Sequence, residues 1–248
     1  MSLLAGYTLL QIVVAALATL GAAFVRGLAG FGMAILLVPV LALALPPVDA
    51  VLVTNFLAVF IGLVELRRLL GGAERSALVI SWWIALATAP GLMLLAMTPP
   101  DLARLLIALV ALAAFAAVLV PAGAPVMPGR AATAGTGIAA GLLTGFAGMP
   151  GVPVVPFYVR RGVPRGVAKA SMLLIFTVAA AAGLVAGALI GALEWRLAWL
   201  AAMLFPLVLL GNWLGGLAFG RVSDRTWRGF VVAVLGAAAL AALGKLLA

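Results

Sequence analysis

Two runs rich in glycine and proline hold the residues of this sequence that are best placed for chemistry. The run GLAGFGMAILLVP covers residues 27–39, and the run GFAGMPGVPVVP covers residues 145–156. Where such residues break a helix, backbone N–H groups lose their helical partners, and the partial positive charge of a helix N-terminus suits small anions. The runs therefore predict an anion site built largely from backbone. Its predicted ligands are Gly27, Gly30, Gly32, Gly145, Gly148 and Gly151, shaped by Pro39, Pro150, Pro153 and Pro156.

Close packing between helices is the alternative role for the same glycines. Small residues let two helix backbones approach each other in a membrane without any ligand. A single glycine-rich run would favour that interpretation. Two interrupted runs at corresponding positions of one chain favour a transport site instead.

A few polar side chains follow each run within apolar sequence. Asn55 lies 16 residues after the last proline of the first run, and Ser171 lies 15 residues after that of the second. Amide, hydroxyl and ammonium groups can all donate hydrogen bonds to an oxyanion. We therefore predict Asn55, Lys169 and Ser171 as substrate ligands, and we place Thr54 and Arg26 at a gate or at the mouth of the site.

Each of these side chains also has a purely structural alternative. An asparagine such as Asn55 can bond a neighbouring membrane helix. The long side chain of Lys169 can extend to the membrane interface. Arg26 can serve only to orient the chain in the membrane.

Several kinds of chemistry are missing from this sequence. It contains no cysteine and no histidine, and its six acidic residues all lie near the ends of apolar segments. Thiol chemistry and the usual zinc sites are therefore excluded, and we expect no metal and no cofactor. Catalytic groups are too few for an intramembrane enzyme, and no nucleotide-binding loop is present. The sequence also shows no clear buried carboxylate that could relay protons across the membrane. Glu65 is the nearest candidate, and it is a poor one.

The composition identifies the setting in which these residues must work. Hydrophobic residues make up 67% of the 248 residues and charged residues 8%. Soluble domains carry about 25% charged residues, so lipid must be the solvent for much of this chain. The net charge of +9 does not indicate nucleic acid, because the basic residues lie singly or in small groups between apolar segments. Such charges orient a membrane protein.

The apolar segments predict an all-α polytopic membrane protein with eight to ten transmembrane segments. The count is open because residues 149–159 make only about half a span at 1.5 Å per residue. A proline- and glycine-rich linker at 122–131 divides the chain into residues 1–121 and 132–248, with five segments each. The candidate segments are 3–25, 28–45, 49–66, 77–97 and 102–121, then 132–147, 149–159, 167–190, 197–219 and 228–247.

The two halves predict an internal duplication. Gly30 matches Gly148 at an offset of 118 residues, and Pro90 matches Pro206 at an offset of 116. Because each repeat has an odd number of segments, the second copy must enter the membrane from the opposite side. With the N-terminus outside, all of the 15 basic residues lie on the inner side except Arg104, Arg196 and Lys245. This bias supports inverted repeats.

With both runs and their order in view, the sequence resembles the TauE/SafE sulfite exporter family, also called the TSUP anion permeases. The first run at 27–39, LALALPPVDAVLVTN at 41–55 and GMPGVPVVPFYVRRGVP at 148–164 carry the resemblance. It extends over roughly residues 20–245. Three departures affect the motifs: Met33, Ala34 and Ile35 stand where many members have more glycine, Val152 replaces a proline, and Pro150 is extra.

The resemblance implies a secondary transporter for small anions such as sulfite, organosulfonates or related carboxylates. It also implies the bacterial inner membrane as the location, with the anion and the lipid bilayer as partners and a homo-oligomer left open. Rocking between two repeats would give alternating access. The alternatives are a passive anion channel of the same fold and a membrane scaffold without transport activity.

Overall fold

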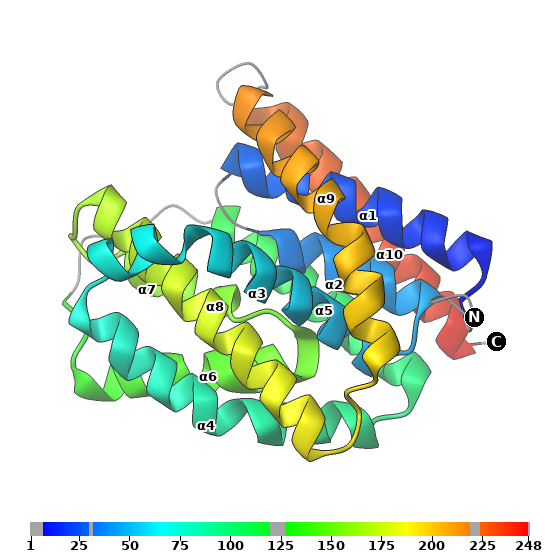
Figure 1. The fold of residues 1–248 in the computed structure, drawn as a ribbon, viewed down its shortest axis with the longest axis horizontal. Coiled ribbons are helices and arrows are strands. Elements are labelled where there is room, and N and C mark those ends of the chain that lie inside the picture. Colours follow the sequence, from blue (N-terminus) through cyan, green and yellow to red (C-terminus); the bar gives the residue numbers. More distant parts are fainter. Residues whose placement is uncertain (1–6, 30–31, 120–126, 219–223, 248) are drawn as a thin grey trace.

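The protein is a bundle of helices, seen here in a computed structural model (Figure 1). The structure describes residues 7–29, 32–119, 127–218 and 224–247, which contain no strand. This confirms the predicted all-α class. Gly30 and residues 122–126 of the predicted linker lie outside the described residues. The helices are α1 (Leu9–Ala29), α2 (Met33–Ala44), α3 (Pro47–Gly72), α4 (Arg75–Met97), α5 (Pro100–Leu119), α6 (Arg130–Ala147), α7 (Gly151–Val159), α8 (Arg165–Leu189), α9 (Trp195–Ala218) and α10 (Asp224–Leu247).

Long apolar helices confirm a multi-pass membrane protein. Within the described part of the chain, five helices are long and apolar enough to cross a membrane. Large apolar side chains cover much of the outer surface, as lipid contact requires. Examples on this surface are Leu63, Val64, Trp82, Leu94, Val185 and Trp213. The five spans are Leu9–Leu28, Pro47–Glu65, Arg75–Met97, Gly166–Leu189 and Trp195–Ala218.

The two glycine- and proline-rich runs form short helices. α2 has 12 residues and α7 has 9, so they are only about 18 Å and 14 Å long. The predicted segment 28–45 is therefore not one helix, because α1 continues to Ala29 and α2 begins at Met33. The second run forms α7, which is about half as long as a membrane span, as the length of the predicted segment 149–159 allowed.

Helices from the two halves of the chain interlock. α1 packs on α9 and α6 packs on α4, while α3 packs on α8 and α5 packs on α10. When α1 to α5 are exchanged in order with α6 to α10, the contact of α1 with α9 becomes the contact of α6 with α4. The contacts of α3 with α8 and of α5 with α10 are unchanged by the exchange. A duplicated chain would pack in this way. The opposite membrane orientation of the two repeats stays a prediction.

Glycines allow these crossings to be close. A Cβ atom at Gly27 of α1 would collide with the backbone of Asn212 in α9. A Cβ atom at Gly145 of α6 would collide with the backbone of Thr88 and Leu92 in α4. Gly27 and Gly145 thus lie at corresponding crossings of the two halves. Both glycines have the packing role that was the alternative to anion binding.

α2 runs through the interior of the bundle (Figure 1). Leu37, Val38 and Leu41 of this helix have no exposed surface. The carbonyl oxygens of its last three residues, which no helical N–H can reach, accept hydrogen bonds from Arg104 Nε, Lys245 Nζ and Gln11 Nε2 at 2.7, 2.8 and 2.7 Å. Cations are favourable at a helix C-terminus. The C-terminal end of α2 is therefore satisfied by protein, and its N-terminal end points away from these partners into the bundle.

The α4–α6 crossing provides a test of this packing. We expect Gly145→Ala to lower the melting temperature of the purified protein in detergent, because overpacking against backbone typically costs about 1–3 kcal/mol. Gly135→Ala in the same helix is the matched control, because no atom lies within 4 Å of the added Cβ. Alanine is the better helix former by about 1 kcal/mol, so the control should be neutral or stabilising. Equal melting temperatures for the two variants would contradict the crossing.

Candidate functional site

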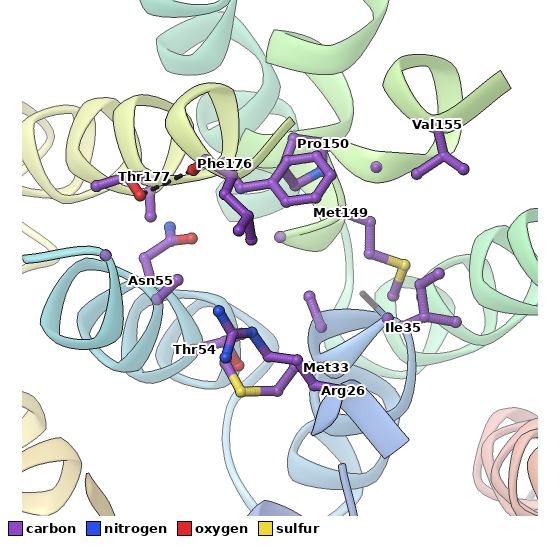
Figure 2. Close-up of a pocket in the computed structure, with 18 of the residues that line it drawn as sticks. Arg26, Met33, Ile35, Thr54, Asn55, Met149, Pro150, Val155, Phe176 and Thr177 are labelled. Atoms are coloured by element: carbon purple, nitrogen blue, oxygen red, sulfur yellow. Dashed lines mark hydrogen bonds between the residues drawn. The ribbon is translucent and has the colours of Figure 1, made fainter. Parts of the chain in front are cut away.

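An inner cavity of about 90 Å³ lies where the N-terminal ends of α2 and α7 come together (Figure 2). Each motif helix contributes its first turn, and α3 and α8 contribute side chains from the middle of the bundle. The cavity is thus shared between both halves of the chain. Its lining includes Gly32, Met33, Ala34, Ile35, Thr54, Asn55, Gly148, Met149, Pro150, Gly151, Val152, Phe176 and Thr177, with Arg26 and Glu65 at one side.

The backbone at both runs depends on glycine. Gly32 precedes α2 with φ +95°, and Gly148 follows α6 with φ +67°. Both values lie in the left-handed region, where a side chain is strained. These two glycines let the chain turn sharply so that α2 and α7 begin at the cavity.

The first turns of α2 and α7 are not capped by the residues that precede them. Gly32 and Pro150 make no side-chain cap bond, and among the described residues no side chain accepts a hydrogen bond from the first N–H groups of either helix. These donors, at residues such as Met33, Ala34 and Gly151, belong to the cavity lining. A helix N-terminus of this kind is an anion-binding arrangement, because its N–H groups and its dipole both favour negative charge.

Two prolines extend the polar backbone of the site. Pro39 lies within α2 and Pro156 lies within α7. Proline has no N–H, so neither can donate to the carbonyl group four residues earlier. Those carbonyl groups belong to Ile35 and Val152, and both residues line the cavity. Each motif helix is therefore weakened within its first two turns, next to the cavity.

Asn55 is the cavity side chain with a donor to spare. It is only 3% exposed, and its Nδ2 atom has no hydrogen-bond partner among the described residues. The hydroxyl groups of its neighbours in the cavity are bonded within their own helices. Thr54 Oγ1 donates to Ala50 O at 2.8 Å, and Thr177 Oγ1 donates to Leu173 O at 2.9 Å. A buried polar group without a partner is rare and calls for an explanation. Figure 2 shows Asn55 beside the cavity, and its Nδ2 atom packs against Gly183 of α8.

Glycines on the facing helix make room for these side chains. A Cβ atom at Gly183 of α8 would collide with Asn55 Nδ2, and one at Gly62 of α3 would collide with Thr177 Oγ1. The two contacts are reciprocal between α3 and α8. Asn55 and Thr177 therefore occupy corresponding places in the two halves, at an offset of 122 residues.

Ser171, which the sequence pairs with Asn55, lies elsewhere. Its hydroxyl is fully buried and accepts a hydrogen bond from the backbone N–H of Glu74 at 3.0 Å. Glu74 also forms an ion pair with Arg161 at 3.0 Å, and Ser76 connects Glu74 to the Tyr158 hydroxyl. Ser171 thus takes part in a polar network that fastens α4 to α7 and α8. It does not line the inner cavity.

A second, larger cavity adjoins the first. This vestibule has a volume of about 380 Å³ and shares Arg26, Glu65 and Leu173 with the inner cavity. Lys169 lines the vestibule and not the inner cavity. The other vestibule residues are Gly27, Gly72, Gly166, Ala170, Asn212 and Gly216.

Arg26 lies at the border between the two cavities. Its Nη2 atom is 3.3 Å from Glu65 Oε2, and its Nη1 atom donates to Asn212 Oδ1 at 2.9 Å. The Arg26 side chain is 11% exposed and that of Glu65 is 32% exposed. From the sequence alone, Glu65, Thr177 and Asn212 all carry little weight. The reciprocal glycines Gly62 and Gly183, 121 residues apart, are the signal that could have drawn attention to Thr177.

The structure therefore divides the predicted site residues into groups. Gly30 lies outside the described residues. Gly145 lies at a helix crossing and Ser171 in the polar network, while Pro39 and Pro153 lie within α2 and α7 without lining either cavity. Gly27 and Lys169 line the vestibule. The inner cavity brings together Arg26, Gly32, Thr54, Asn55, Gly148, Pro150, Gly151 and Pro156.

The comparison with protein families agrees with this architecture. The family model described as sulfite exporter TauE/SafE matches residues 15–242. The chain belongs to the TauE/SafE family. Membership confirms the resemblance carried by the two motif runs and identifies a membrane transport protein. No curated protein and no solved structure matches the chain.

The donor set of this TauE/SafE site suits an anion better than a metal ion. Among the described residues around the inner cavity, the polar groups include the first N–H groups of α2 and α7, the Arg26 guanidinium and the carbonyl groups of Ile35 and Val152, and the carboxylate of Glu65 is paired with that guanidinium. Among the described residues there is no group of three or more acidic, histidine or cysteine side chains. Hard cations prefer several carboxylate or carbonyl oxygens.

The unpartnered amide of Asn55 leads to a stability test. We expect Asn55→Leu to leave the melting temperature of the ligand-free protein unchanged or higher, because it removes a buried donor that bonds nothing. Ser171→Ala is the comparison, since it removes a bonded hydroxyl and should cost about 1 kcal/mol or more. Thermal unfolding in detergent measures both. An equal loss in the two variants would show that Asn55 has a structural role.

Proposed function

We propose that this protein is a secondary carrier for small anions such as sulfite, organosulfonates or related carboxylates. One observation carries the proposal: two uncapped helix N-termini and the free Asn55 amide meet at one inner cavity. Each N-terminus is equivalent to about half a positive charge, so the pair offers about one charge to an anion.

The size of the cavity limits the substrate. A volume of about 90 Å³ suits an anion of a few heavy atoms. An oxyanion can accept hydrogen bonds from several directions at once, as the two helix ends and the amide require. A sulfur oxyanion or a small carboxylate satisfies both conditions.

The arrangement of the two cavities supports alternating access. The inner cavity adjoins the vestibule on one side. At the ends of α3 and α9 that lie away from the vestibule, Asp49 and Arg196 form an ion pair of 3.2 Å. This pair joins one half of the chain to the other. We infer that the conformation opens to the inner side of a bacterial inner membrane, with the N-terminus outside, and that rocking of the repeats breaks the Asp49–Arg196 pair.

Ligand-dependent stability tests the binding site. We expect one class of anion among sulfite, sulfate, thiosulfate, taurine, sulfoacetate, acetate, lactate and chloride to raise the melting temperature in detergent. A ligand at 100 times its dissociation constant adds about 2.7 kcal/mol. Asn55→Ala should weaken binding about tenfold, because a hydrogen bond to a charged group contributes about 1.5–3 kcal/mol. Gly135→Ala should leave binding unchanged.

Flux measurements distinguish a carrier from the alternatives. In proteoliposomes a carrier gives saturable uptake that is accelerated by anion on the opposite side. Fast flux that rises linearly with concentration would indicate a channel of the same fold. No flux and no stabilisation by any anion would leave a scaffold as the better description.

A further inference from the structure

Arg26 is a nearly buried cation, and among the described residues the one carboxylate that pairs with it is that of Glu65. Arg26 belongs to α1 and lines both the inner cavity and the vestibule. Glu65, from α3, and Asn212, from α9, hold its two terminal nitrogens. An anion that moves between the vestibule and the inner cavity must pass this guanidinium.

The contact between Arg26 and Glu65 can be exchanged. Its distance of 3.3 Å is longer than the roughly 2.7–2.9 Å of a strong charge-assisted bond. Glu65 keeps about a third of its side chain exposed, so it loses less hydration when paired than the nearly buried arginine does. A buried guanidinium needs a negative partner at all times. That partner can be Glu65 or another anion of the same charge.

We propose that Glu65 is a tethered competitor of the substrate. The carboxylate occupies Arg26 when the site is empty, and an incoming oxyanion displaces it and takes over the guanidinium. This inference rests on the proposed anion transport and adds a control to it. Asn212 keeps the guanidinium in place during the exchange through its bond of 2.9 Å to Nη1.

The surroundings of Glu65 support the exchange. Among the described residues, the charged side chains that line the same space are Arg26 from α1 and Lys169 from α8. Lys169 gives the displaced carboxylate a second cation within the vestibule. Arg26 and Glu65 can therefore each face an opposite charge both before and after the anion arrives.

The exchange also selects the substrate. A planar guanidinium binds two oxygen atoms side by side, as in carboxylates and oxyanions of sulfur or phosphorus. Glu65 already offers such a group, so only an anion with comparable oxygen atoms competes well. Chloride has one acceptor centre and is a poor competitor. Glu65 thus sets a lower limit on the affinity that a transported anion must have.

Binding of sulfite to the purified full chain tests this competition. We expect Glu65→Gln to bind sulfite about tenfold more tightly than the wild type, since a competing charge is lost while Arg26 stays. Arg26→Ala should weaken binding at least tenfold, and adding Glu65→Gln to it should change nothing further. Glu194→Gln is the matched control, because Glu194 pairs with Arg196 away from both cavities.

The outcomes separate this inference from the proposed function. If the wild type binds sulfite and Glu65→Gln binds it equally or more weakly, the competitor is disproved and the carrier remains. If only Glu65→Gln binds, the competitor is supported. If neither binds, both proposals fail for this anion class. Should Glu65→Gln not fold, Glu65→Asp replaces it. Its shorter side chain holds Arg26 less well, so tighter sulfite binding is expected, and unchanged binding would again disprove the competitor.

Discussion

Every polar backbone group inside a membrane needs a partner, and the two broken helices α2 and α7 make this requirement hard to meet. At α2 the chain meets it at one end only. Arg104, Lys245 and Gln11 satisfy the last carbonyl groups, while no side chain in the described part of the chain caps the first N–H groups. This uncapped N-terminal end of α2 faces the same cavity as the start of α7. The positions of the long helices, the glycines and the buried amide all follow from keeping these two ends together.

The interlocked packing of the two halves of the chain holds the N-terminal ends of α2 and α7 together. The crossings of α1 with α9 and of α6 with α4 rely on glycine at corresponding positions, including Gly27 and Gly145. α3 and α8 then meet across the centre, where Gly183 makes space for Asn55 and Gly62 makes space for Thr177. One set of glycines therefore builds the scaffold, and another leaves room for polar side chains. The left-handed glycines Gly32 and Gly148 turn the chain at the cavity itself.

The sequence predicts those features that depend on local chemistry. Clustered glycine and proline indicate broken helices because their backbone preferences act within a few residues. The first run predicts a broken helix, and α1 ends at Ala29 and α2 begins at Met33 within it, but the bounds of the predicted span 28–45 did not mark that position because no polar residue does. Counting residues from a proline matched Asn55 with Ser171, but depth along a helix does not determine which face a side chain occupies. The partners of Arg26 could not be predicted, because Glu65 and Asn212 lie 39 and 186 residues away in the chain.

The interlocked order of the helices has a consequence for biosynthesis. α1 ends at Ala29 and α9 begins at Trp195, so at about 5–20 residues per second α1 waits on the order of ten seconds or more for the helix it packs against. Without Glu65, Arg26 would be an unpaired charge in lipid during that interval. Glu65 emerges far sooner than Asn212, and it can neutralise Arg26 while the ribosome is still making the second half. The same ion pair can therefore protect the nascent protein before it serves the finished one.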